Sequence, residues 1–184
     1  NYGDDRRTEI LTTHLDLSEE DLIAREEMVV TLSGEGYAKA QPLSDYQAQR
    51  RGGKGRVATR TKQDDFVKSM FIANSHDTIL CFSNYGKVYW LRVYQLPQAG
   101  RQARGRPLVN LLPLNSQERI TAFLPLSKAQ QGQFVFMSTA KGIVKKCSLE
   151  SFSRPRHSGL RALTLSEGDE LVSAGMTQGD SDLL

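Results

Sequence analysis

The residues with the clearest chemical potential form a short run of arginine, lysine and glycine in the first third of the chain. Residues 49–55 read Gln-Arg-Arg-Gly-Gly-Lys-Gly, which places three cations and three glycines within seven positions. No acidic residue lies between Tyr46 and Gln63. Glycine lets a backbone approach its ligand closely, while arginine and lysine pair with phosphate oxygens. The pattern favours a loop that binds an anionic polymer, and a solvated basic loop is the plainer alternative.

Two later segments repeat this chemistry. Residues 101–106 read Arg-Gln-Ala-Arg-Gly-Arg, and residues 154–161 read Arg-Pro-Arg-His-Ser-Gly-Leu-Arg. We therefore expect a series of basic glycine loops that act together. The candidate binding residues are Gln49, Arg50, Arg51, Gly52, Gly53, Lys54, Gly55, Arg56, Arg60, Lys62, Lys87, Arg101, Arg104, Arg106, Lys141, Lys145, Lys146, Arg154, Arg156 and Arg161.

Charge is segregated along the chain, although the formal net charge is only +3. Residues 1–27 hold nine acids and three bases, and residues 166–184 hold five acids and no base. The middle of the chain, residues 28–165, holds 21 bases against seven acids. Solubility alone does not require this separation. It predicts a polyanionic partner for the middle of the chain.

The basic loops need a scaffold, and the sequence around them predicts repeated β-strands. In each unit a serine closes the incoming strand, a glycine makes the turn, and a lysine lies on the outgoing strand. The three sets are Ser33, Gly36 and Lys39; Ser83, Gly86 and Lys87; and Ser138, Gly142 and Lys145. Each unit continues into a basic loop, and an acidic residue (Asp65, Glu118 or Asp169) precedes the next strand.

A period of about 50 residues with several short strands is typical of a propeller blade. We expect blade units at residues 28–77, 78–131 and 132–184. Because a closed propeller needs more blades, these units predict a partial ring. The expected core residues are Val30, Leu32, Ile72, Leu80, Phe82, Val88, Ile120, Phe134, Phe136 and Val144.

Residues 1–27 are predicted to form an acidic linker with a short helix. Ser18 is a suitable N-cap, and Asp21 stands at the third helical position. Leu22 and Ile23 are the few apolar residues of this helix. We therefore expect it to dock weakly, with its acids facing solvent.

Other functional classes find little support in the sequence. Cys81 and Cys147 have no C-x-x-C partner, which favours buried, reduced thiols over a zinc site. The three histidines are scattered, and we expect each to be a surface or loop residue. We find no nucleophile–base set, paired carboxylates or Walker loop, so we expect no enzyme activity, metal or cofactor in this segment. No apolar run reaches the length of a membrane span.

Several strand residues have two interpretations. Lys39 and Lys87 are alternatively charged residues that protect exposed sheet edges from pairing. Tyr89, Trp90 and Tyr94 could stack on nucleic-acid bases, but packing against the core or an interface is favoured.

Residues 49–55 resemble the seven-residue signature box in the C-terminal domain of the gyrase A family. Residues 41–44, 74–77 and 104–114 are similar to the same family, and residues 5–10 resemble the exit from its DNA-cleavage core. The resemblance extends over nearly the whole chain. The related topoisomerase IV family has a similar blade domain with a degraded or absent box, so the intact box favours gyrase.

The resemblance implies an all-β fold, the β-pinwheel, a propeller-like array of four-stranded blades of which this chain supplies about three of six. It implies non-sequence-specific binding, bending and wrapping of double-stranded DNA on a basic rim, which supports negative supercoiling by DNA gyrase. The implied parent is an ATP-dependent type IIA topoisomerase of the bacterial cytoplasm and nucleoid. The implied protein partners are the gyrase A cleavage core and the gyrase B protein in an A2B2 assembly. A protein-interaction propeller that binds an acidic partner is the alternative.

Overall fold

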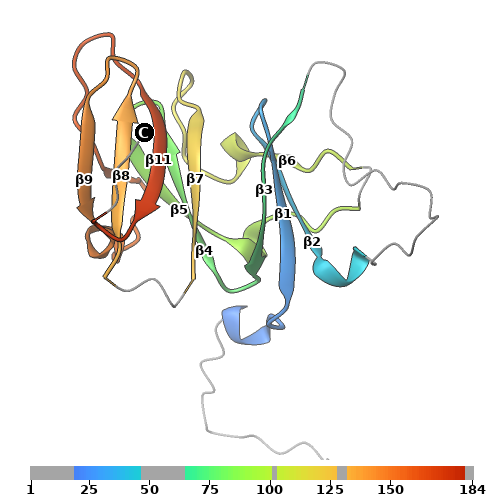
Figure 1. Ribbon diagram of the computed structural model, residues 1–184. Helices are drawn as coiled ribbons and strands as arrows, with labels where there is room; N and C mark the ends of the chain where they lie inside the picture. Colours follow the sequence, from blue (N-terminus) through green and yellow to red (C-terminus); the bar gives the residue numbers. More distant parts are fainter. Residues whose placement is uncertain (1–18, 47–64, 101–102, 128–131, 181–184) are drawn as a thin grey trace, which may run out of the picture.

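Three antiparallel β-sheets form the body of the structure, a computed structural model, which describes residues 19–46, 65–100, 103–127 and 132–180 (Figure 1). The first sheet has the order β3-β1-β2-β6, with β1 at Glu27–Ser33, β2 at Tyr37–Pro42, β3 at Val67–Asn74 and β6 at Arg106–Pro107. The second has the order β10-β5-β4-β7, with β4 at Thr78–Ser83, β5 at Lys87–Arg92, β7 at Ile120–Leu126 and β10 at Leu160–Arg161. The third has the order β11-β8-β9, with β8 at Phe134–Thr139, β9 at Val144–Ser148 and β11 at Leu171–Thr177.

Short 3-10 helices complete the described secondary structure, and the all-β prediction is confirmed. They are η1 at Glu19–Leu22, η2 at Leu43–Asp45, η3 at Val93–Gln95, η4 at Leu108–Asn110 and η5 at Leu149–Phe152. The helix expected in the acidic linker is the single 3-10 turn η1, and its predicted cap Ser18 lies outside the described residues.

Each sheet is built on a hairpin with the same turn chemistry. The predicted turn glycines Gly36, Gly86 and Gly142 have φ of 84°, 71° and 82°, a region that favours glycine. The side-chain oxygens of Ser33 and Ser83 accept the backbone N–H four residues later, at 3.1 and 3.3 Å. The third hairpin uses the hydroxyl of Thr139 for the same bond, at 3.2 Å. The expectation that the third incoming strand ends at Ser138 was wrong by one position, because β8 ends at Thr139.

The acidic residue before the last strand of each unit has a structural role. Oδ1 of Asp65 accepts a backbone N–H of the β1–β2 turn, and Oδ1 of Asp169 accepts one of the β8–β9 turn, both at 3.0 Å. Burial alone would raise the pKa of both carboxyls. The hydrogen bonds that they accept outweigh burial and hold each pKa below its usual value. Asp65 therefore holds the start of β3 to the β1–β2 hairpin, and Asp169 holds the start of β11 to the β8–β9 hairpin.

The fourth strand of the first two sheets comes from the following unit, which was not predicted. β6 leaves the second basic loop and pairs with β2 through Ala38 and Arg106. β10 leaves the third basic loop and pairs with β5 through Val88 and Leu160. Each basic loop therefore folds back on the preceding sheet.

Two hydrophobic clusters lie between the sheets, and β4 contributes to both. Ile79 and Cys81 enter the cluster shared with the first sheet, whereas Leu80 and Phe82 enter the cluster shared with the third. Alternate residues of a strand point to opposite faces, so one strand can serve two interfaces. The second sheet is therefore the packing centre of the array.

The expected core is confirmed at six positions: Val30, Leu32, Leu80, Phe82, Val88 and Ile120 are buried. Phe134 and Phe136 are half-buried. The expectation was wrong for Ile72 and Val144, which are 56% and 61% exposed. Ile72 faces away from the first cluster, and Val144 lies on β9, the last strand of the third sheet. Of the two free cysteines, Cys81 is buried and Cys147 is half-buried.

Candidate nucleic-acid interface

The sheet orders bring the described basic loops to equivalent edges. The end strands are β3 and β6 in the first sheet, β7 and β10 in the second, and β11 and β9 in the third. Figure 1 shows β3, β7 and β11 toward the middle of the array, with β2 and β9 at its two flanks. We call the β6, β10 and β9 ends the outer edges. The arginines of β6 and β10 and the lysines of β9 lie on these outer edges.

The second basic loop is pressed closely against the first sheet. Gly105 has φ of 91°, and a Cβ atom at this position would lie 2.2 Å from the carbonyl oxygen of Ala38. The guanidinium of Arg104 lies 5.3 Å from the ring centroid of Tyr37, a cation–π contact. Arg106 is exposed next to it on β6. The loop therefore presents two arginines from a tightly held backbone.

Lys39 lies beneath this loop and is 1% exposed. Its ammonium donates to the carbonyl oxygen of Ala103 at 3.0 Å and to that of Gly100 at 3.4 Å. Burial lowers the pKa of Lys39. The interpretation of Lys39 as protection of an exposed sheet edge is therefore wrong, because its side chain is internal.

The third basic loop docks on the second sheet in a similar way. Gly159 has φ of 77°, and a Cβ atom there would lie 2.7 Å from the ring of Tyr89. The backbone N–H groups of Ala162 and Leu163 donate to the carbonyl oxygen of Gly86 at 2.9 and 3.1 Å. Arg161 is exposed opposite the half-buried Lys87, so two cations adjoin at this edge. Arg154 and Arg156 are exposed in the same loop.

Three exposed lysines of the third unit are tethered by backbone carbonyls. Lys141, Lys145 and Lys146 donate to the carbonyl oxygens of Glu167, Ala162 and Gly179, at 2.6, 2.7 and 3.2 Å. The Lys146 ammonium also lies 5.1 Å from the ring centroid of Phe134. The acceptors are backbone carbonyl groups, which carry no net charge, so these hydrogen bonds do not compensate the positive charge of the lysines. Their exposed side chains add positive charge to the third outer edge.

The predicted cations differ from Arg92 and Arg119 in their electrostatic partners. Among the described residues, no cation of the predicted set forms an ion pair with a carboxylate. Arg92 and Arg119, which were not predicted, pair with Glu20 at 3.6 Å and with Glu170 at 2.5 Å. The predicted cations thus keep their charge available for an external anion. The remaining predicted residues, 49–56, Arg60, Lys62 and Arg101, lie outside the described residues.

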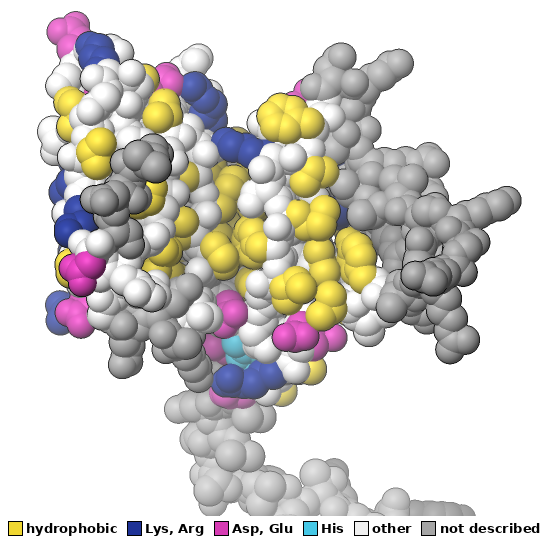
Figure 2. Space-filling view, viewed as in Figure 1, with side chains coloured by type: hydrophobic (Ala, Val, Ile, Leu, Met, Phe, Trp, Pro, Cys, Tyr) yellow, Lys and Arg dark blue, Asp and Glu magenta, His cyan; other side chains and the backbone are white. Residues whose placement is uncertain are grey.

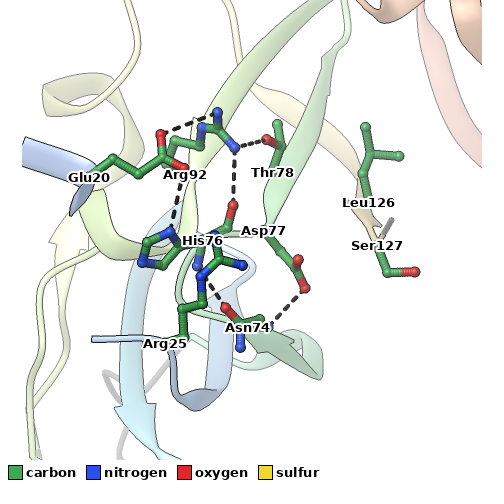
Figure 3. Close-up of a pocket in the computed structure, with 9 residues that line it drawn as sticks. All are labelled: Glu20, Arg25, Asn74, His76, Asp77, Thr78, Arg92, Leu126 and Ser127. Atoms are coloured by element: carbon green, nitrogen blue, oxygen red, sulfur yellow. Dashed lines mark hydrogen bonds and ion pairs between the residues drawn. The ribbon is translucent and has the colours of Figure 1, made fainter. Parts of the chain in front are cut away.

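A second polar site joins the acidic linker to the first two sheets (Figure 3). Glu20 of η1 lies 3.4 Å from Nδ1 of His76, and Nη1 of Arg92 donates to the carbonyl oxygen of His76 at 3.0 Å. Nε2 of His76 lies 2.8 Å from the carbonyl oxygen of Ile23. Only 10% of the His76 side chain is exposed. His76 lies in the turn between β3 and β4, which agrees with its expectation as a surface or loop residue, although its side chain is largely buried. The expectation that the acids of the linker helix face solvent was wrong for Glu20.

The aromatic residues that could have stacked on bases have structural partners. The indole N–H of Trp90 donates to the carbonyl oxygen of Phe152 at 2.9 Å, and the hydroxyl of Tyr89 donates to Glu118 at 3.0 Å. Tyr94 contacts His76 edge-to-face. The favoured interpretation, packing, is confirmed for all three.

Within the described ranges no group of three or more acidic, histidine or cysteine side chains is placed to hold a metal ion. None of the described helices is long and apolar enough to cross a membrane.

Stacked antiparallel sheets that exchange an edge strand with the next unit define a propeller-type domain, here with a basic outer edge. The family model for the DNA gyrase C-terminal domain, beta-propeller, matches residues 27–74, 77–127 and 133–178, one segment for each sheet. The chain belongs to this family.

Similar proteins agree with this assignment. The chain is 58% identical to the DNA gyrase A protein of Haemophilus influenzae and 56% identical to that of Salmonella typhimurium, each over 183 residues. These matches cover 100% of the chain and 21% of each relative, so the chain spans about a fifth of their length. The solved C-terminal domain of DNA topoisomerase IV is 26% identical, with a TM-score of 0.72 over 85% of this chain and 47% of that one.

Proposed function

We propose that this chain binds double-stranded DNA along its outer edges and bends it, without reading base sequence. The observation that carries the proposal is the repeated docking of arginine loops at equivalent sheet edges, with side chains that pair with no described carboxylate. Contacts to phosphate position a duplex but carry no sequence information. Regularly spaced phosphate contacts on a curved array favour a bent duplex. Bending costs about 1–10 kcal/mol, which the additional contacts must offset.

In its larger context we propose that the chain supports negative supercoiling as part of DNA gyrase. The 58% and 56% identity to two gyrase A relatives supports gyrase. The parent would then be an ATP-dependent type IIA topoisomerase in the bacterial cytoplasm, associated with the nucleoid. Its partners would be the gyrase A cleavage core and the gyrase B protein.

The binding proposal is tested by the salt dependence of affinity for a labelled duplex. If the six cations from Arg50 to Lys62 each neutralise one phosphate, log K falls with log salt with a slope of about −5. Affinity would then fall roughly a thousandfold between about 50 and 200 mM salt. A salt-independent affinity contradicts the proposal.

The wrapping proposal is tested by DNA topology. A nicked circle is ligated with the protein bound, and the change in linking number is measured. We expect a change with the native protein and its loss in the double variant Arg50→Ala with Arg51→Ala. The matched control is Arg119→Gln, which also removes an exposed arginine but one that pairs with Glu170. Unchanged wrapping by the double variant would refute the assignment of the first loop.

A second candidate function is the binding of an acidic protein partner. Hydrophobic side chains are exposed in a column over the first sheet (Figure 2), and β3 and the residue before it contribute Phe66, Met70 and Ile72, which are 64%, 46% and 56% exposed. A group of exposed apolar side chains is typical of a protein-binding surface. A partner on this surface would compete with duplex DNA. Competition by an acidic protein, with no change in linking number, would favour this function.

A further inference from the structure

We propose that Lys39 is a buried positioning residue for DNA binding, whose ammonium holds the Arg104–Arg106 loop in its binding geometry. This inference rests on the proposed function. It assigns a role to a lysine that lies inside the molecule, beneath the phosphate-binding surface.

The first argument is the environment of the Lys39 ammonium. Lysine is rarely buried, because removing a charge from water is costly unless hydrogen bonds compensate it. Lys39 is 1% exposed, and its ammonium donates to the carbonyl oxygens of Ala103 and Gly100. Ala103 belongs to the second basic loop and Gly100 directly precedes it, 64 and 61 positions away in the sequence. The lysine therefore tethers a distant loop to β2.

The second argument is the continuity of this tether with the two arginines. Tyr37, Ala38 and Lys39 are consecutive residues of β2, and each contacts the loop. Tyr37 lies beneath the guanidinium of Arg104, and Ala38 pairs with Arg106. Lys39 holds the carbonyl groups that precede both arginines. Without the ammonium, these carbonyls lose a buried donor, and the loop loses its tether on one side of Gly105.

The third argument is that the other sheets have a different arrangement at this position. Counted from the turn glycine, Lys39 corresponds to Tyr89 in the second sheet and to Lys145 in the third. Tyr89 supports the third basic loop with its ring, whereas Lys145 is exposed on β9, where no described loop docks. The comparison with Tyr89 shows that a docked loop does not require a buried lysine here, so Lys39 is a feature of the Arg104–Arg106 loop.

A pair of double-mutant cycles tests the inference through the affinity for a duplex at fixed salt, using the full-length protein. We expect Lys39→Met to weaken binding about two- to tenfold, the cost of ordering one or two side chains on binding. Combined with Arg104→Ala and Arg106→Ala, it should cause little further loss, because the residues it positions are absent. Combined with Arg154→Ala and Arg156→Ala, the losses should multiply. Lys39→Arg should recover most of the affinity, since it keeps the charge and donors.

Lys145→Met is the matched comparison, because it removes the same side chain at the corresponding position of the third sheet. Its loss should multiply with that of Arg104→Ala and Arg106→Ala. Losses that multiply equally in both Lys39 cycles would overturn the inference, because they indicate a general structural role. If Lys39→Met does not fold, Lys39→Gln replaces it in the same cycles, since its amide retains a donor.

Amide hydrogen exchange provides a readout that is independent of DNA. In Lys39→Met, residues 103–108 should lose protection while residues 159–163 retain theirs. Equal loss in both loops, or none in either, would overturn the tether. If the native protein shows no salt-dependent DNA binding, the proposed function fails, whereas the exchange measurement still decides whether Lys39 holds the loop.

Discussion

The two described basic loops have the same topology but rest on different chemistry. Each places a glycine with positive φ against the preceding sheet and adds a two-residue strand, β6 or β10, to its outer edge. Beneath Gly105 a buried ammonium donates to two loop carbonyls. Beneath Gly159 lies the ring of Tyr89, whose hydroxyl donates to Glu118. The close backbone approach is common to both loops, whereas the group that supports it is not.

This difference separates what the repeat requires from what each loop adds. Strand exchange and the glycine contact depend on the backbone, so they recur in sheets with different side chains. Both loops continue into buried apolar residues, Leu108 after the second loop and Ala162 after the third. The loops differ in the group beneath the glycine, which is an ammonium in one and a tyrosine ring in the other. They should therefore differ in their response to substitution and to pH, although both present arginines.

Substitution of the two glycines should have the largest effect. An alanine at Gly105 must adopt positive φ, which costs about 1–2 kcal/mol, and its Cβ overlaps a backbone carbonyl, with overpacking typically costing about 1–3 kcal/mol. At Gly159 the overlap at 2.7 Å is with a ring edge, against 2.2 Å at Gly105. We expect Gly105→Ala to lower the free energy of unfolding more than Gly159→Ala, as measured by urea denaturation. The reverse order would show that the backbone contact is not the tighter constraint.

Removal of the Tyr89 hydroxyl should have the next largest effect. Tyr89→Phe leaves the buried carboxylate of Glu118 without the donor at 3.0 Å, and a hydrogen bond to a charged group is worth about 1.5–3 kcal/mol. Urea denaturation should show a loss in this range. Trp90→Phe, which removes an indole donor to a neutral carbonyl on the same strand, is the control and should cost less. A negligible effect of Tyr89→Phe would mean that the ring alone supports the third loop.

Much of the fold could be predicted because its determinants are local. Turn glycines at Gly36, Gly86 and Gly142, each four residues or fewer beyond an apolar strand, mark the hairpins whatever surrounds them. The exchanged strands β6 and β10 could not be predicted, because two residues have no periodicity. Ile72 was misplaced because its neighbours are also apolar, which hides the alternation that assigns a residue to one face.

The candidate site was predictable in composition but not in detail. Arginine and glycine together indicated Arg104 and Arg106, and charge segregation gave them a partner class. The burial of Lys39 had no sequence signal. The sequence pattern of a lysine in a short strand is the same whether its ammonium is solvated or hydrogen-bonded to loop carbonyls. The burial of His76 had no sequence signal for a related reason: its partners Glu20 and Ile23 belong to a linker whose docking only the fold reveals.

The response to alkaline pH should have opposite signs for the two loops. Burial, the hydrogen bond to Glu118 and its charge raise the pKa of Tyr89, so its contribution is complete below about pH 10 and declines above it. Burial lowers the pKa of Lys39, so the unfolded chain binds more protons between that pKa and about pH 10.4, and stability rises there. The stability advantage of the native protein over Tyr89→Phe should shrink with rising pH, while that over Lys39→Met should grow. Urea denaturation between about pH 8 and about pH 11 measures both, and parallel trends would contradict the distinction between the loops.

The smallest expected difference between the loops concerns the salt dependence of DNA affinity. A phosphate contact contributes about 0.9 to the slope of log K against log salt, whatever holds the cation in place. Arg104→Ala with Arg106→Ala should therefore reduce the slope by about 1.8, and Arg156→Ala with Arg161→Ala by a similar amount. Arg92→Gln, which removes a cation that pairs with Glu20, should leave it unchanged. If only the first pair of substitutions changed the slope, DNA would contact the second basic loop, above Lys39, but not the third, above Tyr89. Equal changes would instead show that the two loops contact the same number of phosphates, whichever group supports them.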